Sequence, residues 1–225
     1  MSVLINTTED SKDSKKPQVP SSTKALIIFT RNPELGKCKT RLAKTVGDEN
    51  ALNIYKKLVE HTAKITEQLN VDKFVYYSDG IRTGDYWNDY TYTKRLQQGK
   101  DLGERMYNAF SLLFSSGYKE IIIIGSDLYD LSEHDLAKAY QHLNDNDYVV
   151  GPATDGGYYL LGMKKLNKRI FEDKAWSSDS VLRETLKDLE GEQFALLEER
   201  NDIDYYEDLK GITDLERVLV KNEPK

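Results

Sequence analysis

A run of basic side chains follows the first apolar stretch of the chain. Between Thr30 and Lys44, five cations less the single acid Glu34 give a local charge of +4, whereas the whole protein has a formal net charge of -6. Guanidinium and ammonium groups neutralise polyphosphate, and Gly36 would let the backbone approach it. A solvated basic turn is the alternative. The segment is not a Walker A loop, which would need glycine at Arg31, and no G-x-G-x-x-G follows.

Two carboxylates also follow apolar runs. Asp127 comes directly after four isoleucines, and Asp155 precedes Gly156 and Gly157 between two apolar stretches. Mg²⁺ is usually held by one or two carboxylates together with substrate oxygens, so Mg²⁺ or Mn²⁺ would suit Asp127. The structural alternatives are an Asx turn at Asp127 and a hairpin turn at Asp155, since Asp-Gly is typical of tight hairpins.

Apolar runs and helical patterns alternate along the chain and must position these side chains. Strands are predicted at 25–29, 73–77, 92–96, 121–124, 148–150, 158–163 and 194–197, and helices at 48–70, 106–113, 132–143, 179–189 and after Asp204. This alternation predicts an α/β fold, a three-layer α/β/α domain with a mostly parallel mixed sheet. Ligands of such sheets bind beyond the carboxyl ends of the strands, where the basic run, Asp127 and Asp155 fall.

Composition restricts the class of protein. Residues 1–23 are polar and aperiodic and are predicted to form a disordered tail, and residues 24–225 a single domain. No apolar run reaches the roughly 20 residues of a transmembrane helix and no signal core is visible, so we expect a cytoplasmic protein. One cysteine and three scattered histidines exclude disulfides and Cys/His metal clusters. The acidic net charge argues against binding to polymeric nucleic acid.

Five segments together resemble a known family. They are FTRNPELGKCKTRLA (29–43), QGKDLGERM (98–106), IGSD (124–127), GPATDGGY (151–158) and WS (176–177). The combination resembles the bacterial GT-A-type glycosyltransferases of the nucleotide-diphospho-sugar transferase superfamily, over about residues 24–210. It is more distantly similar to the guanylyltransferases of molybdopterin and phospholactate metabolism. The resemblance implies a GT-A domain that binds a nucleotide or nucleotide sugar with Mg²⁺ or Mn²⁺.

The resemblance also implies roles for particular residues. Phosphate and nucleotide binding fall to Arg31, Lys37, Lys39, Arg41, Gln98, Gly99, Asp101, Gly103 and Arg105, metal binding to Asp127, catalysis to Asp127 and Asp155, and an acceptor loop to Gly156, Gly157, Tyr158, Trp176 and Ser177. The sequence departs from the family pattern at Tyr129, where proline is usual, and in the ending DIDYYEDL (202–209). Asp204 and Glu207 have capping-box spacing, so we expect Asp204 to cap a helix rather than contact metal. Trp176 could equally anchor the edge of the core.

These observations lead to a functional hypothesis with two alternatives. We expect a divalent-metal-dependent transferase that uses a nucleotide-activated donor, foremost a glycosyltransferase that uses a nucleotide-diphospho-sugar, with Asp155 as general base. The first alternative is a nucleotidyltransferase that makes a nucleotide-diphospho product from an NTP. The second is a non-catalytic nucleotide-binding module. The acceptor would be a small molecule or lipid-linked. The sequence leaves the base, sugar, acceptor and oligomeric state open.

Overall fold

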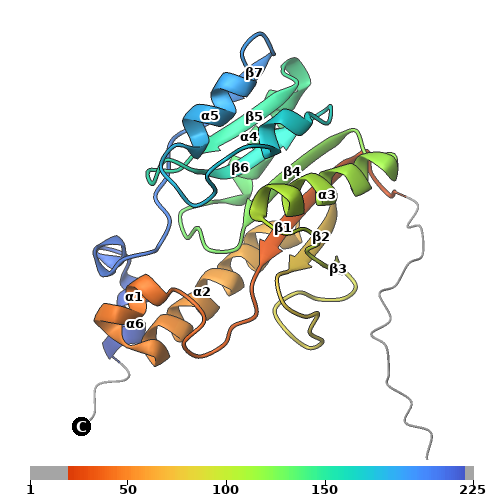
Figure 1. Cartoon of the computed structure of the whole chain (residues 1–225). Coiled ribbons are helices and arrows are strands. Elements are labelled where there is room, and N and C mark those ends of the chain that lie inside the picture. The colour runs from red at the N-terminus through yellow and green to blue at the C-terminus, as the bar shows by residue number, and fades with distance from the viewer. Residues whose placement is uncertain (1–19, 221–225) are drawn as a thin grey trace, which may run out of the picture.

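A seven-stranded mixed sheet forms the centre of the protein (Figure 1). The computed structural model describes residues 20–220. The strands are β1 (Lys24–Thr30), β2 (Asp72–Tyr77), β3 (Tyr92–Leu96), β4 (Glu120–Gly125), β5 (Tyr148–Pro152), β6 (Tyr158–Met163) and β7 (Phe194–Leu196), in the order β3-β2-β1-β4-β6-β5-β7. All neighbours pair in parallel except β6, which is antiparallel to β4 and β5. The predicted fold class is confirmed.

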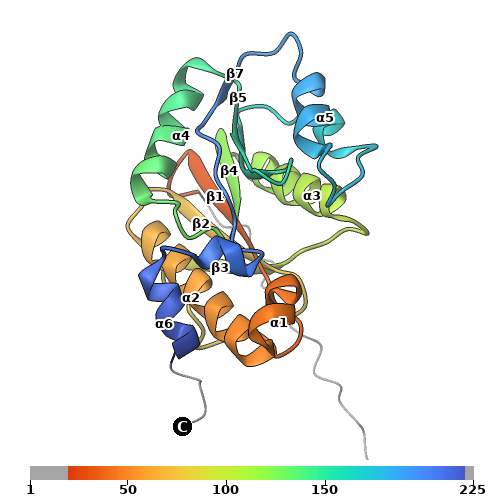
Figure 2. The same ribbon diagram turned by 90° about the vertical axis from the view of Figure 1, so that its left-hand side faces the viewer.

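Helices cover both faces of this sheet. They are α1 (Thr40–Val46), α2 (Asp48–Glu67), α3 (Leu102–Ser115), α4 (Glu133–Asp145), α5 (Val181–Asp188) and α6 (Thr213–Val220), with 3-10 turns η1 (Lys168–Phe171) and η2 (Tyr206–Leu209). Figure 2 shows α4 on one side of the sheet and α3 and α5 on the other. None of the helices in the described part of the chain is long and apolar enough to cross a membrane.

Alternate residues of the central strands fill the two cores. In β4, Ile122 and Ile124 pack in the cluster that contains α2 and α4, whereas Ile121 and Ile123 pack in the cluster that contains α3. Successive side chains of a strand point to opposite faces, so a strand covered on both faces reads as a continuous apolar run. This arrangement makes β4 a rigid support for the residues that follow it. A third, smaller core lies between α1, α2 and α6.

The structure adds detail that the sequence pattern did not predict. The basic segment at 30–44 includes the start of a helix, because α1 begins at Thr40. A seven-residue helix whose only fully buried side chain is Leu42 is too short to show helical periodicity. Most of the predicted tail, residues 1–19, lies outside the described residues. Of its last residues, Ser21 donates its backbone N–H to Asp72 at 2.8 Å.

Candidate active site

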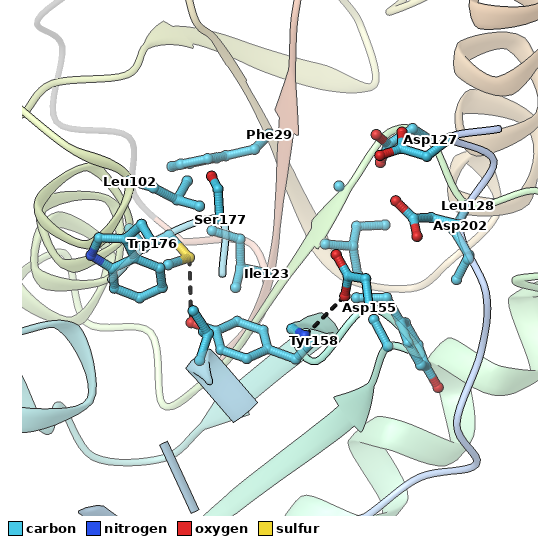
Figure 3. A pocket seen from close by; sticks show the side chains of 18 of the residues that line it. Phe29, Leu102, Ile123, Asp127, Leu128, Asp155, Tyr158, Trp176, Ser177 and Asp202 are labelled. Atoms are coloured by element: carbon cyan, nitrogen blue, oxygen red, sulfur yellow. Dashed lines mark hydrogen bonds between the residues drawn. The ribbon is translucent and has the colours of Figure 1, made fainter. Parts of the chain in front are cut away.

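A cavity of about 780 Å³ opens beyond the carboxyl ends of β1 and β4 (Figure 3). Its polar lining comes from Arg31, Arg41, Asp127, Asp155, Ser177, Ser178, Asp179, Asp202 and Asp204, and its apolar lining includes Phe29, Leu102, Met106, Ile123, Leu128, Tyr158 and Trp176. Parallel α/β sheets bind ligands at this edge because the loops that follow the strands converge there. The cavity therefore brings together the basic segment, both predicted carboxylates and much of the predicted acceptor loop.

Asp127 is held at the end of β4. A Cβ atom on Gly125 would lie 2.8 Å from Asp127 Oδ1, so glycine leaves space for this carboxylate beside the strand. The other oxygen, Oδ2, accepts a hydrogen bond from Lys39 Nζ at 3.0 Å. The Asp127 side chain remains 42% exposed and faces the cavity. Asp127 thus lies two residues beyond a buried strand with its carboxylate partly exposed in the cavity, and its metal-binding and catalytic roles stay predictions.

Lys39 joins two carboxylates. Its ammonium lies 3.0 Å from Asp127 and 2.9 Å from Asp204, and its side chain is only 5% exposed. Burial lowers the pKa of Lys39, but the charges of Asp127 and Asp204 outweigh it, so this pKa is raised and the ammonium stays charged. Lys39 also has a left-handed backbone, with a φ of 47°. The structure therefore places Lys39 between two acids rather than in the cavity.

Of the other three predicted phosphate ligands, two line the cavity and one does not. Arg31 and Arg41 line the cavity, and Arg41 Nη1 contacts Asp204 at 3.1 Å. Lys37 lies outside the lining and pairs with Glu34 at 2.8 Å, while its carbonyl accepts a hydrogen bond from Arg31. Among the described residues that line the cavity, Arg31 and Arg41 are the only arginine or lysine side chains.

Asp202 is a cavity carboxylate that sequence reasoning did not select. Burial, followed by the charge of Asp204, raises the pKa of Asp202 to about 6, and the nearby charges of Asp127 and Asp155 act in the same direction while Lys39 opposes them. The sequence pattern does not single out Asp202, because the capping-box spacing in the DIDYYEDL motif involves Asp204 instead. The alternating pattern Asp-Ile-Asp, with Ile203 buried, is the signal that could have found it.

Asp204 does not cap the following turn, so that prediction is wrong. Its carboxylate pairs with Lys39 and Arg41. The capping oxygen is Asp208 Oδ2, which accepts hydrogen bonds from the backbone of Asp204 at 3.0 Å and Tyr205 at 2.6 Å. The N-cap residue of η2 is Tyr205, one residue later than expected.

The predicted nucleotide loop contributes little to the cavity lining. Gln98, Gly99, Asp101, Gly103 and Arg105 are absent from it. Asp101 caps α3 by accepting a hydrogen bond from the Glu104 backbone at 2.9 Å, and Arg105 Nε donates to the Gly99 carbonyl at 3.1 Å. These hydrogen bonds lie within the loop itself. The binding of a nucleotide by these five residues stays a prediction.

The predicted acceptor loop lies mostly in the cavity. Gly157, Tyr158, Trp176 and Ser177 line it, but Gly156 does not. Gly156 has a φ of 88°, and its Cα packs so closely on the Asp179 backbone that a Cβ atom would lie 2.3 Å from the Asp179 carbonyl oxygen. The β5–β6 connection is also a hairpin, so Asp155 lies in a turn and lines the cavity at once.

The oxygen ligands of the cavity fit a divalent metal that is shared with a substrate. Within residues 20–220, no three His, Cys, Asp or Glu side chains form a metal site by themselves. Asp127 and Asp202 nevertheless face the same side of the cavity (Figure 3), and both are hard oxygen donors. One or two carboxylates plus phosphate oxygens are the usual ligands of Mg²⁺. Asp127 and Asp202 are therefore the residues that could hold Mg²⁺ or Mn²⁺.

Replacing Asp202 with asparagine is expected to stabilise the metal-free protein. A carboxyl group whose pKa is raised to about 6 in the fold favours folding while it is protonated. This stabilisation is lost as the pH rises from about 4 to about 6. In EDTA at pH 7.5 the Asp202→Asn variant should melt roughly 2–4 °C above the wild type, and the gain should shrink towards pH 4.5.

Thermal unfolding over this pH range tests the expectation. The matched control is Asp179→Asn, since Asp179 also lines the cavity but is exposed. An equal rise in melting temperature for both variants, or a rise that does not change with pH, would show that the ionised Asp202 carboxylate does not destabilise the fold.

The fold and cavity define the chain as a protein of the nucleotide-diphospho-sugar transferase fold class. The chain belongs to the family described as "Uncharacterized protein conserved in bacteria (DUF2064)", whose model matches residues 61–178. A search of curated proteins gave no match.

Solved structures support this fold class. A protein from Desulfovibrio desulfuricans G20, provisionally named a nucleotide-diphospho-sugar transferase, has a TM-score of 0.80 and 26% identity, covering 91% of this chain and 100% of its own. A cytidylyltransferase from Leptospira borgpetersenii has a TM-score of 0.55 and 13% identity, covering 89% and 94%. The 4-diphosphocytidyl-2C-methyl-D-erythritol synthase from Anaerococcus prevotii has a TM-score of 0.51 and 12% identity, covering 88% and 96%. The last two show the fold alone.

Proposed function

We propose that this protein is a glycosyltransferase that moves a sugar from a nucleotide-diphospho-sugar to a neutral hydroxyl acceptor. The observation that carries the proposal is the distribution of charge in one cavity. Its two cations, Arg31 and Arg41, both come from the segment after β1, whereas the loop after β5 supplies the acid Asp155. A diphosphate has cationic partners on the first side, and a hydroxyl has a proton acceptor on the second.

The donor side would act through charge. Arg31 and Arg41 would bind the diphosphate, and Asp127 with Asp202 would hold Mg²⁺ or Mn²⁺ against its oxygens. A bound divalent metal supplies Lewis-acid stabilisation of the negative charge on the departing phosphate. Lys39 would orient the Asp127 carboxylate from outside the cavity lining, because the Lys39 side chain is buried and its ammonium contacts Asp127 Oδ2 at 3.0 Å.

On the acceptor side, Asp155 would serve as general base. Its Oδ1 accepts a hydrogen bond from the Gly157 backbone at 2.9 Å, which orients the carboxylate within the hairpin turn. The acceptor oxygen bonds to the anomeric carbon, the bond from that carbon to the diphosphate oxygen breaks, and the acceptor proton passes to Asp155. The products are a glycoside and a nucleoside diphosphate.

Nucleotidyl transfer is the second candidate, because two of the similar structures carry the names of a cytidylyltransferase and a CMP:2-keto-3-deoxy-manno-octonic acid synthetase. When the acceptor of such a reaction is a phosphate, it needs cations of its own. The described lining near Asp155 offers carboxylates and hydroxyls but no arginine or lysine. This charge pattern favours a neutral acceptor and hence sugar transfer.

Donor binding followed by product analysis tests the proposal. Nucleoside diphosphates and nucleotide sugars should raise the melting temperature with Mn²⁺ and much less with EDTA, because stabilisation grows with the logarithm of ligand over Kd. Mass spectrometry should then show release of nucleoside diphosphate from the best-binding sugar donor. The Asp155→Asn variant should keep the thermal shift but lose about 10²-fold or more in turnover.

Three other outcomes would contradict glycosyl transfer. No shift with any nucleotide would contradict both enzymatic candidates. Pyrophosphate release from an NTP would support nucleotidyl transfer, whereas a shift without turnover of any donor would support a non-catalytic nucleotide-binding module.

A further inference from the structure

One side of the cavity is apolar. It consists of Phe29, Leu102, Met106, Ile123, Tyr158 and Trp176, here called the apolar wall. Figure 3 shows Phe29, Leu102, Ile123 and Trp176 on the side opposite Asp127 and Asp202. The catalysis proposed above uses the charged side chains of the cavity. The apolar wall therefore has no role in that chemistry, although Leu102 leaves 41% of its surface exposed there.

The Trp176 indole is held in place by close packing. A Cβ atom on Gly103 would lie 2.5 Å from Trp176 Cζ2 and 2.4 Å from the Phe171 carbonyl oxygen, so the ring rests directly on the backbone of α3. A side chain larger than hydrogen at Gly103 would push the indole away. The indole thus forms a fixed flat surface at the cavity, which suits stacking with a flat ring.

The segment after Trp176 is also fixed in an unfavourable conformation. Ser177 has a φ of 69°, in the left-handed region that residues other than glycine rarely adopt. The segment is tied to the hairpin of Asp155 by the Leu182 N–H, which donates to the Gly156 carbonyl at 2.8 Å. Strained backbone of this kind is concentrated at ligand sites, because surrounding contacts must maintain it.

Tyr158 places one hydroxyl group within the apolar wall. This hydroxyl donates to the Met106 sulfur at 3.8 Å, as Figure 3 shows. A thioether is a weak acceptor, and burial raises the pKa of Tyr158, so the group remains a neutral hydroxyl. The apolar wall therefore offers a flat ring surface and one weakly engaged polar group.

We propose that the apolar wall binds a flat apolar ring of the acceptor, so that the acceptor is a hydroxyl compound built on or linked to an aromatic or fused-ring group. This inference rests on the proposed glycosyl transfer. Tyr158 follows Asp155 by three residues, across the turn between β5 and β6, so a ring that contacts Tyr158 lies next to the hairpin that carries the general base. The acceptor hydroxyl would then reach Asp155 while its ring contacts Trp176.

A nucleobase is the other flat ring that could occupy this surface. Specific recognition of a base requires hydrogen bonds to its edge, and Tyr158 is the only hydroxyl-bearing side chain among the six residues of the apolar wall. The polar loop after β3, at 97–101, lies outside the lining. These features favour the acceptor ring.

Saturation-transfer NMR with benzyl alcohol tests the proposal, with glycerol as the alcohol that lacks a ring. We expect transfer to the ring protons of benzyl alcohol and little to glycerol. The signal should fall about fivefold or more in Trp176→Ala and at least twofold in Leu102→Ala. Leu102 is exposed, so its variant should fold even if Trp176→Ala does not. The matched control is Leu112→Ala, an exposed leucine of α3 outside the cavity, which should keep the wild-type signal.

Addition of the best-binding nucleoside diphosphate with Mn²⁺ distinguishes the two sources of a ring. The benzyl alcohol signal should persist when the donor site is filled. Its complete displacement would show that the apolar wall binds the base and would overturn the proposal, as would an equal signal in wild type and Leu102→Ala. If no nucleotide binds but the ring signal depends on Trp176, the proposed function fails while the apolar wall is still a ring-binding site.

Discussion

The Asp127→Asn variant is expected to lose about 10³-fold or more in turnover at saturating donor and metal. Asparagine keeps the size of the side chain and removes the charge that would hold Mg²⁺ or Mn²⁺ against the diphosphate. Without that cation the departing phosphate retains its developing charge, and electrostatic stabilisation of this kind commonly supplies several kcal/mol of catalysis. Steady-state kinetics with the best sugar donor measures the loss, and electron paramagnetic resonance of Mn²⁺ should show weaker binding by the variant.

Asp130→Asn provides the control for this variant. Asp130 lies three residues further along the same loop and pairs with Arg200 at 3.1 Å, outside the cavity lining. It should retain nearly full turnover and Mn²⁺ binding. Full turnover of Asp127→Asn at saturating metal would refute the metal role of Asp127, whereas loss of turnover with unchanged Mn²⁺ binding would move the metal to other ligands.

The edge of the sheet at which the cavity lies could be predicted from the sequence. The four isoleucines at 121–124 favour a strand buried on both faces, and Asp127 must then emerge at the carboxyl edge of the sheet. Position along the chain and alternation of elements were sufficient for this conclusion. That the segment after β1 lies beside Asp127 follows from the structure, in which β1 and β4 are neighbouring parallel strands.

The contacts of single side chains could not be predicted in this way. The charges of Lys37 and Lys39 are identical, and the two residues are separated only by Cys38. The left-handed backbone of Lys39 turns its ammonium inward, whereas Lys37 pairs with Glu34 at the surface. Asp202 and Asp204 come from a segment more than 70 residues beyond Asp127, as their numbers show. Only the path of the chain after β7 places them beside it.

Lys39 neutralises two carboxylates that would otherwise repel each other. Its ammonium is within 3.0 Å of Asp127 and 2.9 Å of Asp204, while Arg41 reaches only the second of these acids. Removing one partner of a buried ion pair commonly costs about 3–5 kcal/mol, because the remaining charge stays buried without compensation. Since Asp127 is partly exposed, we expect a loss near the lower limit.

The Lys39→Met variant should therefore melt roughly 6–12 °C below the wild type in EDTA at pH 7.5. Mn²⁺ should recover more of that loss in the variant than it adds to the wild type, because a cation between Asp127 and Asp204 would replace the missing ammonium. Calorimetry with and without Mn²⁺ measures both effects, and Lys37→Met is the control, since Lys37 is exposed at the surface and its loss should matter little. Equal melting temperatures for the two variants would mean that the buried ammonium is not needed for stability. A large loss that Mn²⁺ does not restore would mean that Mn²⁺ does not replace the ammonium between Asp127 and Asp204.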